Sequence, residues 1–272
     1  MSGLRFDLHA AAVLAPGLAS LADLRRASRA GQPPAEAAPL ALPSPAVLPA
    51  NERRRASTVV RLTLSCIEQA LQASPFAVES LRSVFATDEG TGEVCQQMLE
   101  AMATTRQVSP LVFTNSVQNA PSGNFAIAWR NRQSATVASL GLESFASGLL
   151  CAVTEAATTQ QPVLLVAYDP AMTAPLAELL PVTEPVATAW ILSAGSAGRD
   201  APVLGSFAFE LGPAGVERPS PLPPWLPPRW AAFSSARALA ALGLLESAPG
   251  TVLRLTLAST LLSLRRIDEG AA

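Results

Sequence analysis

A chain of 272 residues, 49% hydrophobic and 15% charged, is long enough for a substantial core and too apolar for intrinsic disorder. Its 19 basic and 21 acidic residues leave a net charge of −2, which excludes a broad electropositive surface for nucleic acid. All 19 basic residues are Arg, so Schiff-base chemistry and a phosphate-binding loop that requires lysine are excluded as well.

The first quarter of the chain predicts a strand, a connector and two helices. Residues 3–15 alternate and then run apolar, as in a buried strand, and 18–29 favours a short helix. Residues 32–50 are rich in Pro and Ala and cannot sustain a helix. Asn51 can cap the helix that apolar spacing predicts over 52–73.

A strand, a glycine-containing turn and a helix follow. The apolar run 83–87 predicts a buried strand, and helical spacing resumes at Val94. Between them stands Asp88-Glu89-Gly90-Thr91-Gly92, which holds two of the three glycines of a dinucleotide-binding loop and no Lys. We interpret this segment as a tight connection between strand and helix rather than as a phosphate site.

The middle of the chain alternates strands and helices. Residues 113–129 mix small, polar and aromatic side chains; 135–140 predicts a strand, and a helix face starts at Phe145. Residues 163–168 form a continuous apolar strand. This alternation predicts a layered α/β sheet.

The last third predicts two neighbouring strands and a short ending. The strands 186–193 and 203–211 lie close together in sequence, so we expect them to form an antiparallel hairpin that closes the sheet. The Pro-rich stretch 213–229 is the clearest boundary, interpreted as a surface loop rather than a polyproline ligand. A helix over 230–246 and a strand over 251–257 follow it.

Common catalytic and metal-binding patterns are missing from the sequence. Gly141-Leu142-Glu143-Ser144-Phe145 does not match the G-x-S-x-G elbow of serine hydrolases. The three cysteines have no C-x-x-C spacing, and His9 is the single histidine. We therefore predict no metal site and no cofactor.

Three segments carry a resemblance to a known family. They are Ser109-Pro110 with the block N-S-V-Q-N-A-P-S-G over 115–123, the strand and helix start over 135–149, and the strand over 162–169. Together they resemble the N-terminal half of a β-ketoacyl synthase of the thiolase-like superfamily. The likeness runs from about residue 3 to 211 and is strongest to the short synthase-like proteins of aryl polyene and related polyketide pathways.

The resemblance implies a fold and a division of the chain. We expect a thiolase-like α/β layered domain, with a five-stranded mixed sheet flanked by helices, that represents only the N-terminal half of a ketosynthase architecture. Residues 1–212 would form this domain, 213–229 a Pro-rich linker, and 230–272 a short helix and strand appendage.

Departures from the family pattern bear on catalysis. A working synthase has a cysteine at the N-terminus of its nucleophile helix, where the helix dipole lowers the thiol pKa. Counting back from the strand 163–167 puts that position within 141–143, where no Cys stands, and Cys151 lies about two turns into the helix. The family also uses two histidines from its C-terminal half, and no His follows His9.

A synthase-like chain without these groups resembles a chain-length factor, the inactive partner of an active ketosynthase. In that family the strand before the nucleophile helix, here about 135–140, pairs across the dimer axis, so we expect a heterodimer through these residues. An acyl carrier protein is the second expected partner. Candidates for the remnant of the active site and the cavity are Asn115, Asn119, Gly123, Gly141, Leu142, Glu143 and Ser144.

Two other hypotheses stay open. The chain could be a carrier-protein-binding or scaffold module of such a pathway, without influence on the cavity. It could also be a synthase or acyltransferase that uses Glu143 or Cys151 instead of the usual cysteine. Glu143, near a helix start, is otherwise a dipole or capping residue.

The cellular location follows from the cysteines and the hydropathy. Cys66, Cys95 and Cys151 are odd in number and widely separated, which predicts buried free thiols in a reducing compartment. The N-terminal stretch carries charges and breaks at Pro16-Gly17, unlike a signal peptide. No uncharged apolar run is long enough for a membrane span. We expect a cytoplasmic protein.

Overall fold

One mixed sheet forms the centre of the computed structural model, which describes residues 3–34, 39–195, 198–213, 215 and 217–267. Its eight strands lie in the order β3-β2-β4-β5-β1-β6-β8-β7. They are β1 Leu4–Leu14, β2 Arg82–Ala86, β3 Ala135–Ala138, β4 Val163–Asp169, β5 Val186–Ser193, β6 Gly205–Pro213, β7 Val252–Leu257 and β8 Thr260–Ile267. The strands β3, β2 and β4 are parallel, and all the other neighbours are antiparallel.

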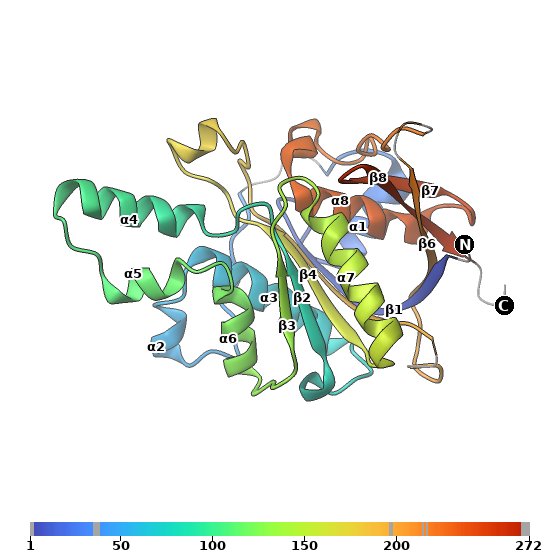
Figure 1. Ribbon diagram of the computed structural model, residues 1–272, viewed down its shortest axis with the longest axis horizontal. Coiled ribbons are helices and arrows are strands. Elements are labelled where there is room, and N and C mark those ends of the chain that lie inside the picture. The colour runs from blue at the N-terminus through green and yellow to red at the C-terminus, as the bar shows by residue number, and fades with distance from the viewer. Residues whose placement is uncertain (1–2, 35–38, 196–197, 214, 216, 268–272) are drawn as a thin grey trace.

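Helices cover both faces of the sheet (Figure 1). The α-helices are α1 Leu21–Ala30, α2 Ala50–Arg53, α3 Thr58–Gln72, α4 Gly92–Thr104, α5 Pro110–Asn115, α6 Ala120–Ala128, α7 Ser144–Thr159 and α8 Ser234–Gly243, and the short 3-10 helices are η1 Val78–Ser80, η2 Leu176–Glu178, η3 Pro228–Ala232 and η4 Leu244–Glu246. Helices α1, α7 and α8 pack on one face, and α3 and α6 on the other. Helices α4 and α5 pack on each other and project from the body (Figure 1).

Burial on both faces explains why β4 reads as a continuous apolar run. Val163 and Leu165 belong to the core beneath α7 and α8, whereas Leu164 and Val166 belong to the core beneath α3 and α6. All seven residues of β4 are buried. A strand with a helix layer on each side has no polar face, so the alternation of a half-exposed strand is lost.

The single histidine has a structural position in the sheet. His9 lies where the pairing of β1 with β5 shifts register, between Leu8 and Ala10. Its ring is buried, with Nε2 2.8 Å from Oγ of Ser193 and Nδ1 2.8 Å from the carbonyl oxygen of Pro202. Both ring nitrogens are therefore engaged in hydrogen bonds at the point where the pairing of β1 with β5 is irregular.

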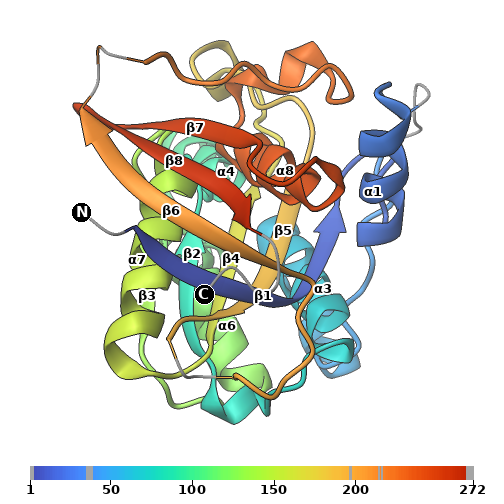
Figure 2. The ribbon, with the colours of Figure 1, turned by 90° about the vertical axis from the view of Figure 1, so that its right-hand side faces the viewer.

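Eight strands replace the five predicted from the sequence. The expected hairpin of β5 with β6 is wrong as well, because β1 lies between them and pairs antiparallel with both. The strand β1 is eleven residues long: its first part, Leu4–Leu8, pairs with β6, and Asp7–Leu14 pairs with β5. Figure 2 shows β1, β6, β8 and β7 side by side.

Strand β8 was absent from the sequence prediction. It pairs antiparallel with β7 and with β6, so the segment after the Pro-rich stretch belongs to the same sheet as the rest. The hairpin between β7 and β8 turns at Ala258, whose φ is +51°. Because Gly and Asn usually mark such left-handed turn positions, an alanine there hides the turn from sequence analysis.

The helix predicted over 52–73 is two helices. Helix α2 ends at Arg53, and α3 starts at Thr58 after Ser57, whose backbone is extended. Ser57 holds the position before α3 through its extended backbone and makes no capping hydrogen bond with its side chain. Three consecutive arginines before it, Arg53 to Arg55, also repel one another.

The Pro-rich stretch runs along the outer edge of β7. The N–H of Ser220 donates to the carbonyl of Arg254 at 2.9 Å, and the N–H of Arg254 donates to Oγ of Ser220 at 3.0 Å. Pro219 and Pro221 flank this contact and have no N–H to offer. This edge of the sheet is therefore covered by a segment that cannot continue the ladder.

Helix α7 packs tightly against the sheet at Gly148. A Cβ there would lie 2.7 Å from Cβ of Ala86 and 3.3 Å from Cδ1 of Leu165. We expect Gly148→Ala to lower the free energy of unfolding by about 1–3 kcal/mol, since α7 must shift to fit the methyl group. Gly123→Ala in α6 is the matched control: nothing lies within 4 Å of its Cβ position, so we expect a gain of up to about 1 kcal/mol. Equal melting temperatures for the two variants would contradict this packing.

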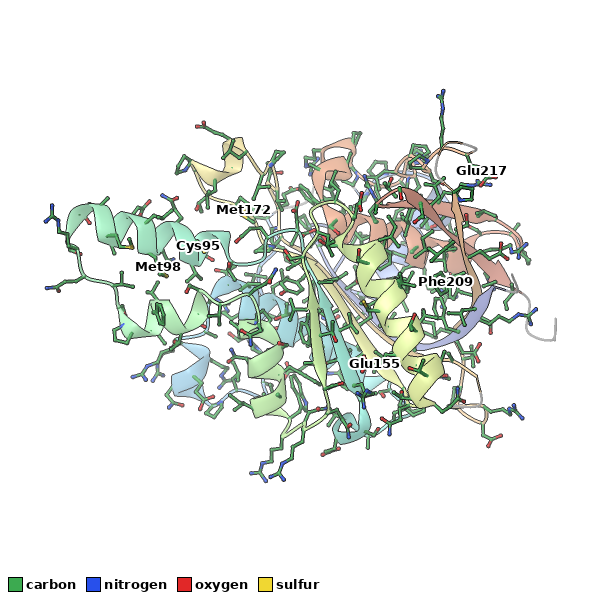
Figure 3. All side chains as sticks on the ribbon, viewed as in Figure 1. Cys95, Met98, Glu155, Met172, Phe209 and Glu217 are labelled. Atoms are coloured by element: carbon green, nitrogen blue, oxygen red, sulfur yellow. The ribbon has the colours of Figure 1, made fainter. Side chains whose placement is uncertain are left out.

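Within the described residues, no helix combines the length and the hydropathy that crossing a bilayer requires. Cys66, Cys95 and Cys151 are free thiols, as the sequence predicts, but only Cys66 is buried, and Cys95 and Cys151 are partly exposed. Cys95 and Met98 lie on the side of α4 that faces α5 (Figure 3).

Candidate functional site

The turn from β3 into α7 is built around one glycine and one serine. Gly141 has a φ of +62°, a left-handed conformation that glycine adopts without strain. Ser144 Oγ accepts from the N–H of Leu140 at 2.8 Å and donates to the carbonyl of Gly141 at 2.7 Å. These bonds fix the point at which α7 begins, which is Ser144.

No cysteine stands at the start of α7. Its first turn is Ser144-Phe145-Ala146-Ser147, slightly later than the 141–143 obtained by counting back from β4. Cys151 lies two turns further, half-buried, and burial raises the pKa of its thiol, with the charge of Glu155 adding to the effect. A raised pKa leaves less thiolate, so Cys151 is a poorer nucleophile than an ordinary cysteine.

Phe145 occupies the inward position of that first turn. Its side chain is fully buried, and its ring centroid lies 5.4 Å from that of Trp190. Its N–H donates to Oγ of Ser234, the first residue of α8, at 2.9 Å. The N–H group that a helix start would offer to an oxyanion is therefore already bonded within the protein.

A buried carboxylate at the end of β4 holds the neighbouring segments together. Asp169 accepts from the N–H of Asp88 at 2.8 Å, from the N–H of Ser235 at 2.7 Å and from Oγ1 of Thr87 at 3.3 Å. Burial raises its pKa to about 6, because the loss of hydration outweighs these hydrogen bonds. Asp169 thus links the end of β2, the end of β4 and the start of α8.

Asp169 and its hydrogen bonds were not predicted from the sequence. An acidic residue directly after a fully apolar strand was the available signal. Ser235 lies 66 residues away in sequence, so the partner could not be found from local spacing.

The turn between β2 and α4 is a structural connection, as predicted. Gly90 has a φ of +77°, and Glu89 turns its carboxylate toward the start of α4, where it accepts from the N–H and the hydroxyl of Thr91, each at 3.0 Å. Burial and the charge of Glu89 raise the pKa of Asp88. A second anion such as phosphate would meet these carboxylates instead of free N–H groups.

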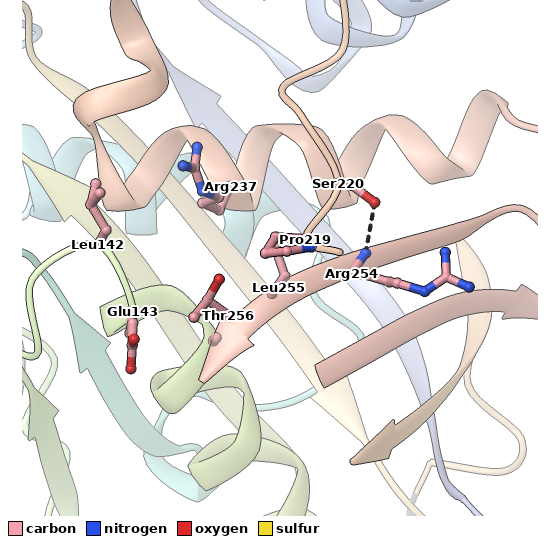
Figure 4. A pocket seen from close by; sticks show the side chains of 9 residues that line it. Leu142, Glu143, Pro219, Ser220, Arg237, Arg254, Leu255 and Thr256 are labelled. Atoms are coloured by element: carbon pink, nitrogen blue, oxygen red, sulfur yellow. Dashed lines mark hydrogen bonds between the residues drawn. The ribbon is translucent and has the colours of Figure 1, made fainter. Parts of the chain in front are cut away.

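Glu143 lines a pocket at the start of α7 (Figure 4). It holds the position before the helix but makes no capping hydrogen bond. Its Oε2 instead accepts from the N–H of Ala258, in the turn between β7 and β8, at 2.7 Å. The pocket has a volume of about 200 Å³, and its walls come from α7, the Pro-rich stretch, α8 and β7: Leu142, Glu143, Ala146, Pro219, Ser220, Arg237, Arg254, Leu255 and Thr256.

A second pocket lies between the start of α3 and the projecting helices α4 and α5. It has a volume of about 240 Å³ and is lined by Arg55, Ala56, Ser57, Thr58, Glu93, Val94, Gln97, Leu111, Val112 and Asn115. It shares no lining residue with the pocket at Glu143.

The candidates from the sequence therefore fall into three places. Leu142 and Glu143 line the first pocket, next to Gly141 and Ser144 in the turn, whereas Asn115 lines the second. Asn119 and Gly123 belong to the start of α6, where space is open around Gly123.

The chain matches a known family over most of its length. The profile of the family described as β-ketoacyl synthase, N-terminal domain, matches residues 26–204. A comparison with curated protein sequences found no match.

Three solved structures have the same fold over nearly the whole chain. The structure of a ketosynthase (ApeO) in complex with its chain length factor (ApeC) from Xenorhabdus doucetiae matches 97% of this chain and 100% of its own chain, with 23% identity and a TM-score of 0.72. AntDE:AntF, a type II acyl-carrier protein in complex with its ketosynthase, matches 98% and 100%, with 12% identity and a TM-score of 0.74. The ishigamide ketosynthase/chain length factor matches 97% and 100%, with 12% identity and a TM-score of 0.72.

Proposed function

This chain belongs to the β-ketoacyl synthase N-terminal domain family, and we propose that it is the non-catalytic, chain-length-factor-like partner of an active ketosynthase. The start of α7 carries this proposal. No thiol stands there, Phe145 fills the inward position, and the Phe145 N–H is bonded to Ser234. Because His9 is bound within the sheet, the chain supplies no histidine for decarboxylation. The partner ketosynthase supplies the nucleophilic cysteine and the histidines.

The two edges of the sheet support pairing through β3. The outer edge of β7 is covered by the Pro-rich stretch, whereas β3 pairs only with β2 among the described strands. An uncovered edge strand is a template for another chain. We therefore propose that β3, with the residues up to Leu140, pairs with the ketosynthase in a heterodimer.

Most of the exposed large apolar side chains lie in the stretch of sequence around β3. Of the exposed large hydrophobic residues in the described chain, most lie between residues 99 and 142: Leu99, Met102, Leu111, Phe113, Val117, Ile127, Leu140 and Leu142. Exposed apolar residues that lie together on a surface are typical of an interface. It supports a partner on this side of the molecule.

The helices beside this edge are the proposed wall of the cavity into which the acyl chain grows. Asn115 lines the pocket between α3, α4 and α5, and Asn119 and Gly123 follow in α6. In this role the volume of these side chains limits product length. Ser144 is unsuited to a volume test because it is fully buried and makes two hydrogen bonds.

Gly123→Trp is expected to shorten the product of the assembled complex by about two to four carbons, since a bulky side chain takes space from the growing chain. The indole has room, because nothing lies within 4 Å of the Gly123 Cβ position. The measurement is mass spectrometry of products from the chain co-expressed with each ketosynthase of its own organism. Size-exclusion chromatography checks assembly, and Gly123→Ala is the matched control.

Separate monodisperse monomers on size exclusion would overturn the proposed pairing. Elongation or decarboxylation of acyl thioesters by the chain alone would overturn its non-catalytic role.

The wider setting of the proposal is a pathway that makes aryl polyenes, polyketides or fatty-acid-like chains in the cytoplasm. An acyl carrier protein is the second proposed partner, supported by the similar fold of a ketosynthase solved with its acyl-carrier protein. If Gly123→Trp leaves product length unchanged in an assembled complex, the scaffold or carrier-binding hypothesis replaces the cavity role. Covalent acyl labelling of the isolated chain at Glu143 or Cys151 would favour the acyltransferase hypothesis.

A further inference from the structure

The open edge of β3 carries opposite charges at its two ends. Arg130 and Arg132 stand just before the strand, both are exposed, and neither forms an ion pair with any other part of the described chain. The carboxylate of Glu155 reaches this end, where it accepts from Oγ of Ser134 at 2.9 Å, but it is already paired with Arg82. The start of β3 is therefore a basic end.

The far end of the strand is acidic. Glu143 follows β3 after the turn at Gly141, and its carboxylate accepts from the N–H of Ala258 without an ion pair to any described residue. Asp88 lies at the same end, with Oδ1 3.8 Å from the place that a Cβ on Gly141 would occupy. A parallel neighbour of the same sequence would set like charges side by side, whereas an antiparallel one sets the arginines against the carboxylates.

The backbone of β3 can bond to a second copy of the chain. The carbonyls of Ser134 and Ala138 accept from β2, so by strand alternation the N–H and the carbonyl of Val137 face outward. A two-fold axis at Val137 lets this residue exchange two hydrogen bonds with Val137 of the other copy, as in any antiparallel pair. The strand reads Ala-Thr-Val-Ala, and its small side chains leave room for the second backbone. The edge is thus complementary to itself.

We propose that two copies of this chain pair antiparallel through β3 when no ketosynthase is bound, with Arg132 of each copy beside Glu143 of the other. Self-pairing uses the edge that the heterodimer uses, and in this respect it rests on the proposed function. β3 has one open edge, so a copy held in the homodimer cannot offer the strand to a ketosynthase. The homodimer is a self-blocked form of the chain, and the ketosynthase displaces it.

The interface between the two copies is small. β3 has four residues, and the exposed apolar side chains that follow it in the sequence are Leu140 and Leu142. Stable protein complexes bury about 1,200–2,000 Å² of surface, so a short strand with two leucines from each copy gives a weak dimer. We expect a dissociation constant in the micromolar range, which a partner with a larger complementary surface can overcome.

The test is sedimentation equilibrium of the full chain alone, across the micromolar range. We expect a monomer–dimer equilibrium, and we expect Arg132→Glu to weaken it by about fivefold or more, because it sets a glutamate beside Glu143 at two symmetric places. Arg218→Glu is the matched control: Arg218 is exposed in the Pro-rich stretch, which covers the other edge of the sheet. We expect this control to dimerise within about twofold of the unaltered chain.

A charge swap checks the pairing of the two ends. Arg132→Glu combined with Glu143→Arg restores unlike neighbours in reversed order, so we expect dimerisation to return to within about threefold of the unaltered chain. A folded double variant that stays as weak as Arg132→Glu would overturn the assignment. So would an unaltered chain that is monomeric throughout, or equal dissociation constants for Arg132→Glu and Arg218→Glu. If loss of the bond to Ala258 prevents the double variant from folding, the comparison of the two single variants decides.

Addition of a ketosynthase separates this homodimer from the proposed function. We expect the homodimer to give way to a heterodimer that holds one copy of the chain. A chain that is monomeric alone and binds a ketosynthase would refute the homodimer but not the proposed function. A chain that is dimeric alone and binds no ketosynthase would refute the proposed heterodimer. A complex in which two paired copies bind a ketosynthase would overturn the self-blocked form.

Discussion

Proline in place of Val137 is expected to weaken the association with the partner ketosynthase by about 100-fold or more, which corresponds to about 2.8 kcal/mol. The carbonyls of Ser134 and Ala138 accept from the N–H groups of Ser83 and Thr87, at 3.0 and 3.1 Å, so even-numbered residues of β3 face β2. By strand alternation, Val137 turns its N–H and carbonyl to the open edge. Proline removes that N–H and blocks the edge but leaves the ladder with β2 intact.

The matched control is Val137→Ala, which removes the same partly buried side chain and keeps the N–H. We expect this variant to bind the partner within about threefold of the unaltered chain, as in a surface substitution worth about 0.6 kcal/mol. Affinities are measured by surface-based or calorimetric titration, with melting curves to confirm the fold. If the proline variant binds as tightly as the alanine variant, β3 is not the pairing edge.

Asp169→Ala is expected to lower the free energy of unfolding by about 3 kcal/mol or more. It leaves the N–H groups of Asp88 and Ser235 and the hydroxyl of Thr87 without their acceptor, and each unsatisfied buried group costs about 1–3 kcal/mol. Removal of the buried charge offsets part of this loss. Chemical denaturation measures the change, and Asp200→Ala, at an exposed carboxylate, is the control. A loss below about 1 kcal/mol would mean that the three donors find other partners.

The same carboxylate predicts a direction for the pH dependence of stability. Its pKa is raised by burial from 3.8 to about 6, so the folded state holds the proton more tightly than the unfolded state. The contribution of Asp169 is therefore full below about pH 4 and is lost as the pH rises through about 6, by roughly 3 kcal/mol at most. Asp169→Asn does not titrate, so the stability difference between the two proteins should shrink on going from pH 4 to pH 7. A difference that grows over this range would contradict a pKa raised by burial.

Local patterns in the sequence were sufficient for most of the elements. The apolar runs that became β2, β4 and β5 and the helical spacing of α3 and α7 report how each residue is buried, and burial is a property that periodicity records directly. The inventory of reactive groups is likewise independent of folding. A chain with one histidine and no cysteine in the residues that start α7 lacks the cysteine and the histidine pair of a working synthase, however it folds.

The order of the strands and the make-up of the pockets depended on the tertiary structure. The position of β1 between β5 and β6 rests on backbone hydrogen bonds that every residue type except Pro can make. The bond from the N–H of Ser235 to the carboxylate of Asp169 likewise joins residues far apart in the chain. Side-chain patterns carry no record of such partners. The pocket at Glu143 needs α7, α8, β7 and the Pro-rich stretch to meet, and these segments are more than 100 residues apart at the extremes of the set.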